Sequence, residues 1–186
     1  MRFTPNPSLT KMGCHAVTAR HYSAQEILRS GLRLTIRAAR PDDRPHIAID
    51  FVNKVMLVAA MPFDGGEIVI GSACYVADDM ADGLREARVA FTIEQLYQAL
   101  GIASQLLKHL AAIARLYGIT RLAADVLPNN ESLSTLFEHS GFPLRRQRLD
   151  DVTRVTLALA GPWPLKLRIG SPCTRQQPKH LTERDR

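Results

Sequence analysis

Cysteine is scarce in this chain, and its three copies lie far apart, at Cys14, Cys74 and Cys173. Neither a disulfide framework nor a CxxC metal site can be built from such an odd and widely spaced set. The six histidines also lack the spacing of metal ligands, such as HxxxH. We therefore expect no structural metal. Cys74 lies in an apolar strand pattern and is interpreted as a small buried hydrophobic residue.

Long apolar runs are missing as well. No segment approaches the roughly 20 residues that a membrane-spanning helix needs. The N-terminal Met1–Leu9 has no apolar stretch of the kind found in secretory signals. We therefore expect a cytoplasmic protein with no membrane partner. With 186 residues, 46% of them hydrophobic, the chain can form one domain with its own core.

The net charge of +6 is concentrated at the two ends of the chain. Residues 1–30 hold four basic and one acidic residue, and residues 160–186 hold six and two. The central residues 31–159 hold 14 basic and 15 acidic residues, a charge of −1. A specific nucleic-acid-binding face is therefore disfavoured, although basic tails could add weak, salt-sensitive affinity. We expect three segments: a flexible leader over 1–22, a folded domain over 23–160 and a flexible basic tail over 161–186.

The first half of the expected domain has the pattern of antiparallel strands. Alternating residues around the turn Ser30-Gly31 predict a β-hairpin over Gln25–Arg37. After the hairpin, Pro41-Asp42-Asp43 ends the strand, and we expect a short helix from there to about Asn53. The strands predicted next are Val55–Ala60, Glu67–Val76 and Arg85–Ile93.

The second half predicts a strand–helix–strand unit. Apolar residues at three- and four-residue steps indicate a helix over Gly101–Tyr117, which Gly118 ends. The strand Thr120–Leu127 follows at once, so we expect a parallel, right-handed crossover. The remaining predicted elements are a helix over Glu131–His139 and the strands Leu144–Leu149 and Val152–Leu159, joined by the turn Asp150-Asp151.

The most informative segment leads from a strand through a short loop into the long helix. The first turn of a helix has free N–H groups and the positive end of the helix dipole. Small residues at Gly101 and Ala103 would let a phosphate approach this backbone. Alternatively, both are small only because the helix packs close to the sheet. Neither GxxxxGK[ST] nor GxGxxG is present, so nucleoside triphosphate hydrolysis and dinucleotide binding have no support.

Two motifs, together with the order of the elements, resemble the GNAT N-acetyltransferase family, and in detail its bacterial protein-lysine acetyltransferases. A QxxGxA motif begins at Gln98, and the segment Asn130–Phe142 (NESLSTLFEHSGF) follows at the family's distance. The resemblance covers roughly Glu26 to Leu159. It implies an α/β (α+β) fold with a mixed central sheet of about six to seven strands, helices on both faces and an N-terminal β-hairpin.

The resemblance also implies a co-substrate and its contacts. Acetyl-CoA would bind without a metal. Its pantetheine arm would pair with the backbone of Phe91, Thr92 and Ile93, and Asn130 would contact the same arm. The thioester would lie where the strand that ends at Ile93 separates from the strand after the long helix. Backbone N–H groups would hold the pyrophosphate, from Gln98, Ala99, Leu100, Gly101, Ile102, Ala103 and Ser104.

The implied reaction acetylates an amine, either a protein lysine or a small molecule, and the attacking amine must lose a proton. Related enzymes use a glutamate for this step, but the matching position is Arg88, which cannot act as a base. Glu86 lies on the same strand face and is the candidate replacement, unless it is only a solvated carboxylate. Phe137 stands where relatives have a tyrosine acid. Glu94 and Tyr97 are other possible stand-ins.

Three functions stay open from the sequence, with an acetyl-CoA-dependent N-acetyltransferase as the leading one. Arg88 and Phe137 also suit a degenerate GNAT domain that binds acyl-CoA as a sensor or partner module. The basic tails suit a nucleic-acid-associated protein. Relatives have two helices beside the acceptor site where this chain has only Pro41–Lys54, so we expect an open acceptor side. A homodimer is also compatible with the sequence.

Overall fold

The computed structural model describes residues 19–43, 48–80 and 83–159, and one mixed β-sheet organises them. The sheet has eight strands in the order β1-β2-β3-β4-β5-β6-β8-β7, and only the neighbours β5 and β6 are parallel. The strands are β1 (Ser23–Ile27), β2 (Arg33–Ala38), β3 (Lys54–Phe63), β4 (Gly66–Asp79), β5 (Arg85–Ile93), β6 (Arg121–Val126), β7 (Leu144–Leu149) and β8 (Val152–Ala158). The helices are α2 (Ile102–Leu116) and α3 (Glu131–Glu138), with 3-10 turns η1 (Pro41–Asp43) and η2 (Gln95–Tyr97).

The predicted mixed sheet, N-terminal hairpin and parallel crossover are confirmed. Strands β1 and β2 form the hairpin, and α2 connects β5 to β6. The sheet has eight strands rather than six to seven because both terminal hairpins, β1–β2 and β7–β8, join it. Gly118 ends α2 in the left-handed conformation, with φ 75°, as predicted.

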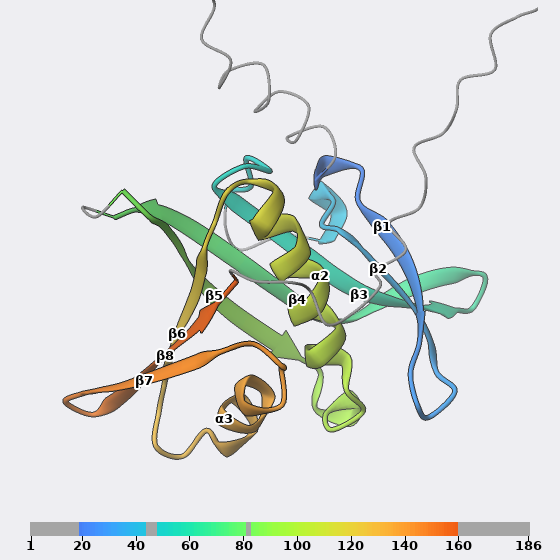
Figure 1. The fold of residues 1–186 in the computed structure, drawn as a ribbon. Helices are drawn as coiled ribbons and strands as arrows, with labels where there is room; N and C mark the ends of the chain where they lie inside the picture. Colours follow the sequence, from blue (N-terminus) through green and yellow to red (C-terminus); the bar gives the residue numbers. More distant parts are fainter. Residues whose placement is uncertain (1–18, 44–47, 81–82, 160–186) are drawn as a thin grey trace, which may run out of the picture.

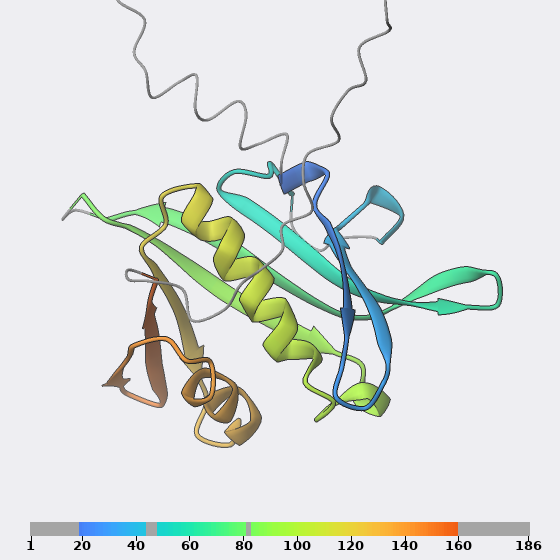
Figure 2. The same ribbon diagram turned by 45° about the vertical axis from the view of Figure 1, so that its right-hand side comes forward.

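Helix α2 crosses one face of the sheet over β3, β4 and β5 (Figures 1 and 2). Its apolar residues recur every three to four positions, so that Leu106, Leu110 and Ala114 are fully buried. Helix α3 adds Phe137 to the same buried cluster. Helices α2 and α3 therefore contribute to one buried cluster.

On the opposite face of β3 and β4, described residues of the segment between β2 and β3 pack against the sheet. A smaller buried cluster there contains Ala39, Met56, Val58 and Cys74, and Ile49 packs against it. Cys74 is 6% exposed, which confirms its predicted place in the apolar interior.

The helix predicted over residues 41–53 is wrong within the described part of that segment. Only Pro41–Asp43 is helical, as a 3-10 turn. A carboxylate satisfies the following backbone donors instead, because one oxygen of Asp50 accepts hydrogen bonds from the amides of residues 52–54, each at 2.8 Å. Such side-chain contacts compete directly with helix formation.

Buried Arg37 ties this segment to the sheet. Its guanidinium donates to both oxygens of Asp43, at 2.7 and 2.9 Å, and to Glu67 at 2.9 Å. The hydrogen bonds from Arg37 hold the pKa of Asp43 below its ordinary value. The ion pairs of Arg37 with Asp43 and Glu67, and not a helix, therefore hold the start of this segment against the sheet.

Two residues of the predicted leader belong to the packed domain. Ala19 is 1% exposed within the main cluster, and Tyr22 packs against that cluster. Residues 1–18 of the leader and the whole basic tail lie outside the described residues. No helix in the part of the chain that the structure describes is long and apolar enough to cross a membrane.

His109, which is 1% exposed, joins α2 to the N-terminal hairpin. Its Nδ1 shares a hydrogen bond with the Tyr22 hydroxyl, and its Nε2 lies 3.0 Å from the Glu26 carboxylate. Burial lowers the pKa of His109 below its ordinary value of 6.5, although Glu26 opposes this shift. Burial, with Glu26 adding to it, raises the pKa of Tyr22 to about 12. The fold therefore favours the neutral imidazole.

We expect acidification from about pH 7.5 to about pH 5.5 to reduce the stability of the protein through His109. The unfolded chain protonates this residue near pH 6.5, whereas the folded chain does so only at lower pH. The free energy of unfolding should therefore decrease as the pH is lowered, by at most about 1.4 kcal/mol per pH unit for this one proton. Urea unfolding at several pH values measures the loss. His109→Gln does not titrate and should lose less; an equal loss in both proteins would contradict the prediction.

Candidate functional site

The loop between β5 and α2 has an unusual backbone. Strand β5 ends at Ile93, and the next N–H, that of Glu94, donates to the Ile70 C=O at 3.0 Å. Ala99 and Gly101 then adopt left-handed conformations, with φ of 61° and 86°. Glycine reaches this region freely, whereas it costs another residue about 1–2 kcal/mol. Strain of this kind at Ala99 is characteristic of binding loops whose surroundings impose the conformation.

The backbone amides at the start of α2 have no internal partner. The Gln98 N–H donates to the Gln95 C=O at 3.4 Å, and the Gln105 N–H donates to the Gly101 C=O at 3.2 Å. The six N–H groups between them, from Ala99 to Ser104, have no acceptor in the described part of the chain. They lie at the positive end of the helix dipole, so an anion is the ligand that suits them best.

The parallel strands β5 and β6 pair over three positions only: Glu86–Arg121, Ala87–Leu122 and Arg88–Ala123. Beyond Arg88 the strands diverge (Figure 1). The Arg85 C=O accepts the Thr120 N–H on the β6 side at 2.9 Å, and successive residues of a strand direct these groups to alternate sides. Phe91 therefore directs its N–H and C=O to the same edge, past the end of the pairing. An extended ligand can add to such an edge as a strand.

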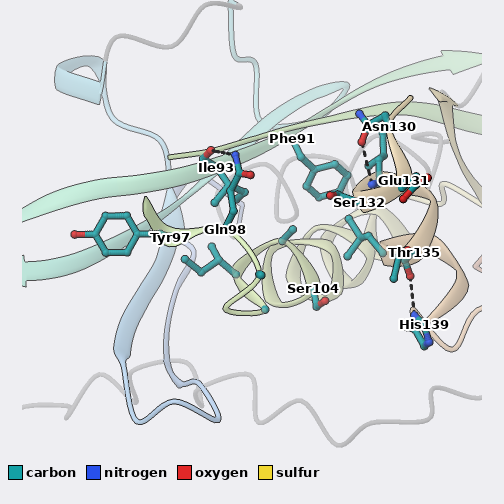
Figure 3. A pocket seen from close by; sticks show the side chains of 16 residues that line it. Phe91, Ile93, Tyr97, Gln98, Ser104, Asn130, Glu131, Ser132, Thr135 and His139 are labelled. Carbon is teal, nitrogen blue, oxygen red and sulfur yellow. Dashed lines mark hydrogen bonds between the residues drawn. The ribbon is translucent and has the colours of Figure 1, made fainter. Parts of the chain in front are cut away.

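A cavity of about 730 Å³ lies between β5, the loop, the start of α2 and helix α3 (Figure 3). Thr92 and Leu100 are not among its lining residues, and Thr92 pairs with Ser72 of β4 instead. The other predicted cofactor-binding residues all line it: Phe91, Ile93, Gln98, Ala99, Gly101, Ile102, Ala103, Ser104 and Asn130. The cavity thus brings together residues of the open strand edge and of the unbonded amides.

Helix α3 forms a wall of the cavity that the sequence analysis missed. The residues it contributes are Glu131, Ser132, Leu133, Thr135, Leu136 and His139, and Tyr97 of η2 lines the loop side. A signal was present in the sequence: the polar residues Ser132, Thr135 and His139 recur at helical spacing and therefore share one face.

Asn130 begins helix α3 and also borders the cavity. Its carboxamide oxygen accepts a hydrogen bond from the Leu133 N–H at 3.1 Å, as an N-cap does. Its NH₂ group has no partner within the described residues, and the side chain stands at the cavity wall (Figure 3). This NH₂ is therefore the group that can donate to a ligand.

None of the residues that line the cavity is a lysine or an arginine. The starts of α2 and α3 both face it, and each supplies the positive end of a helix dipole. Among the described residues, no group of three or more His, Cys, Asp or Glu side chains could hold a metal ion. The site fits a phosphate-containing ligand that is held by backbone amides.

The candidate catalytic residues lie on the other face of β5. Arg88 donates to Asp78 at 3.3 Å, and both side chains are more than half exposed. Asp125 accepts two hydrogen bonds from Arg154, at 2.8 and 3.1 Å, which hold the pKa of Asp125 below its ordinary value. The same hydrogen bonds from Arg154 to Asp125 raise the pKa of Arg154, and the negative charge of Glu86 adds to this shift. Half-buried Glu86 is therefore part of a row of alternating charges.

Phe137, at the position of the expected hydroxyl acid, is a core residue. It is 1% exposed, and its ring packs edge-on against Phe91 with centroids 6.3 Å apart. A phenyl ring has no proton to donate. Of the two stand-ins considered, Tyr97 lines the cavity, whereas Glu94 is exposed and does not line it.

The site combines diverging central strands with a helix start whose unbonded amides suit an anion, and it fits an extended, phosphate-containing ligand. The family model of the acetyltransferase (GNAT) family matches residues 25–142, and the chain belongs to this family. The resemblance and the fold class inferred from the sequence are thereby confirmed.

The chain is similar to several solved structures. The GNAT domain of S. lividans PAT is 28% identical, with a TM-score of 0.60, over 73% of this chain and 96% of that chain. A cAMP-binding acyltransferase from Mycobacterium smegmatis is 20% identical and has the same fold, with a TM-score of 0.61 over 85% of this chain and 54% of that chain. The putative acetyltransferase yncA from Salmonella typhimurium, with its cofactor acetyl-CoA, is 21% identical, with a TM-score of 0.47 over 59% and 66% of the two chains.

We expect Gly101→Ala to destabilise the loop through its backbone alone. The new Cβ would meet nothing within 4 Å, but φ is 86°. The cost should be about 1–2 kcal/mol, which lowers the melting temperature by roughly 2–4 °C per kcal/mol. Ala99→Gly is the matched control because it relieves the same strain two residues away, and it should cause no loss. Equal melting temperatures for Gly101→Ala and the wild type would contradict this prediction.

Proposed function

We propose that this protein is an N-acyltransferase that transfers the acetyl group of acetyl-CoA to an amine, either a protein lysine or a small molecule. The observation that carries the proposal is the row of six unbonded amides, from Ala99 to Ser104, beside the unpaired edge of β5. Membership of the acetyltransferase family supports the same donor.

The donor matches the site in three parts. Its pyrophosphate suits the amides at the start of α2, where no lysine or arginine lines the cavity. Its pantetheine arm carries amide groups that can pair with the free backbone edge at Phe91, as an added strand does. The NH₂ group of Asn130 can donate to one of the pantetheine carbonyls. The thioester then lies near the gap that opens beyond Arg88 and Ala123.

The reaction breaks the C–S bond of the thioester and forms a C–N bond. The amine attacks as its neutral form, so its ammonium proton must pass to a base, and the departing thiolate takes up a proton. The oxyanion that develops needs a hydrogen-bond donor, such as a backbone N–H of a strand. The acceptor would approach from the face opposite α2, because the donor occupies the cavity face.

Glu86 is the base that we propose. It lies on the acceptor face and accepts no side-chain hydrogen bond within the described residues. Arg154 lowers the pKa of Asp125, and Asp78 accepts a hydrogen bond from Arg88. Of the three carboxylates in this row, Glu86 is the one that accepts no side-chain hydrogen bond within the described residues.

A protein lysine is the acceptor that we favour. The segment before β3 contains only the 3-10 turn Pro41–Asp43 among its described residues, so it does not build a helical wall beside the acceptor face. An unwalled face accommodates a macromolecular substrate more readily than a small one. The resemblance to protein-lysine acetyltransferases favours the same class of acceptor.

We expect acetyl-CoA to bind in solution and to be consumed when an amine is supplied. Binding to the folded state alone should stabilise it by about 2.7 kcal/mol at 100 times Kd, which raises the melting temperature. Thiol release, measured with a panel of lysine peptides and small amines, should follow. Glu86→Gln should leave the melting shift unchanged and reduce turnover by about 10²-fold or more. Absence of both the melting shift and thiol release in the folded wild type would refute the proposal.

A second candidate function is a domain that binds acyl-CoA without turning it over. Two observations favour it: Arg88 stands at the glutamate position, and Phe137 is a buried ring without a hydroxyl. Neither change touches the amides that would hold the donor. The donor site could therefore be intact while the proton-transfer chemistry is lost.

Arg88→Glu distinguishes the two functions. For a binding-only domain, we expect the wild type to bind acetyl-CoA without thiol release, and Arg88→Glu to create turnover by supplying a base beside the gap. For an active enzyme that uses Glu86, the wild type turns over, and Arg88→Glu changes the rate without creating it. Arg88→Gln is the matched control, because it removes the same positive charge and adds no base. Equal gains from the Glu and Gln variants would mean that loss of the arginine, not a new base, is responsible.

A further inference from the structure

We infer that Gly71 of β4 positions the loop that holds the acyl-CoA pyrophosphate; the inference rests on the proposed function. Gly71 is buried in the middle of the sheet, between its partners Ala59 of β3 and Ile93 of β5. Its φ lies outside the left-handed region, unlike that of Gly101. A glycine is therefore needed here for space and not for conformation.

The space at Gly71 is already filled by three neighbours. A Cβ added there would lie 2.6 Å from Cδ1 of Ile93, 3.3 Å from the backbone oxygen of Thr92 and 3.4 Å from Cγ2 of Ile102. Carbon atoms in contact prefer about 3.5–4.0 Å. The end of the Ile93 side chain would have to move and the Thr92 oxygen would be crowded, whereas Ile102 would lie at the near limit of ordinary contact.

Both isoleucines belong to the proposed pyrophosphate site. Ile102 begins α2, is 1% exposed, and carries one of the six unbonded amides. The Ile93 C=O accepts a hydrogen bond from the Gln98 side chain at 3.3 Å, which fixes the start of the loop. Ile93 and Ile102 also line the cavity. A repacked Ile93 side chain therefore changes the wall of the site beside the donors.

The neighbouring residue of β4 contacts the same loop. The register between β3 and β4 shifts at Ala59 and Ala60, which leaves Ile70 as the extra residue of a β-bulge. The Ile70 C=O accepts the Glu94 N–H at 3.0 Å, directly after β5 ends. Two consecutive residues of β4 thus set where the loop begins. Ile70 does so through its hydrogen bond, and Gly71 does so because it has no side chain.

Small displacements at this place should have large effects on binding. Hydrogen bonds to an anion are short, about 2.7–2.9 Å, and site geometry has to hold to within about 0.5 Å. An alanine at Gly71 changes no group that could touch the ligand. Any loss of affinity would therefore come from the position of Ile93 and Ile102.

The test compares acetyl-CoA affinity by calorimetry in four proteins: the wild type, Gly71→Ala, Ile93→Val, and the pair Gly71→Ala with Ile93→Val. Gly71→Ala should raise Kd by about tenfold. Ile93→Val removes the one atom, Cδ1, that the new Cβ would strike at 2.6 Å, so the pair should return to within about threefold of Ile93→Val. Gly66→Ala in the same strand is the control, because its Cβ would meet only the Phe63 oxygen, at 3.7 Å, and its Kd should equal that of the wild type.

The outcomes separate this inference from the proposed function. A wild type that does not bind acetyl-CoA refutes the proposed function, and the positioning role is then refuted with it. A wild type that binds, with Gly71→Ala binding equally well, overturns the role of Gly71 alone. Rescue by Ile93→Val supports positioning, since a general loss of stability would not be reversed by truncating a second core residue. If Gly71→Ala does not fold, a folded pair that binds tenfold more weakly than Ile93→Val overturns the inference, and one that binds equally supports it.

Discussion

Backbone N–H groups in folded proteins almost always find an acceptor, so six consecutive unpaired ones impose a constraint on everything around them. The left-handed conformations of Ala99 and Gly101 keep these N–H groups away from the backbone carbonyls that would otherwise accept their hydrogen bonds. Helix α2 is then held against the sheet by a buried apolar face, so its first turn cannot fray to find internal partners. The donors stay available because the packing below them is rigid.

Much of this arrangement could be predicted because its signals are local. Alternation on either side of Ser30-Gly31 predicts the hairpin, and helical periodicity before Gly118 predicts α2 to within one residue at each end. The amide row was found in the same way, since a small-residue loop followed at once by a helix is a pattern within Gln98–Ser104. All residues of that segment except Leu100 line the cavity.

What could not be predicted depends on contacts between distant segments. The helix expected before β3 is absent because Asp50 and the buried pair Arg37–Asp43 satisfy polar groups that a helix would otherwise satisfy. Thr92 was assigned to the cofactor, but its pairing with β4 turns its backbone away from the gap. The wall formed by α3 depends on how that helix docks beside β5, through Phe137 on Phe91, and no local pattern encodes this contact.

The position of Glu86 decides how the proposed chemistry could work. Two residues along a strand span about 6.6 Å, so Glu86 is set back from the gap by that distance relative to Arg88, where pairing with β6 ends. A carboxylate that far from the reacting amine cannot take its proton directly, because transfer requires hydrogen-bond reach or one intervening water. Proton transfer from the amine to Glu86 would therefore require one intervening water. An enzyme built this way depends on an ordered water, whereas a binding-only domain does not, and this requirement separates the two functions physically.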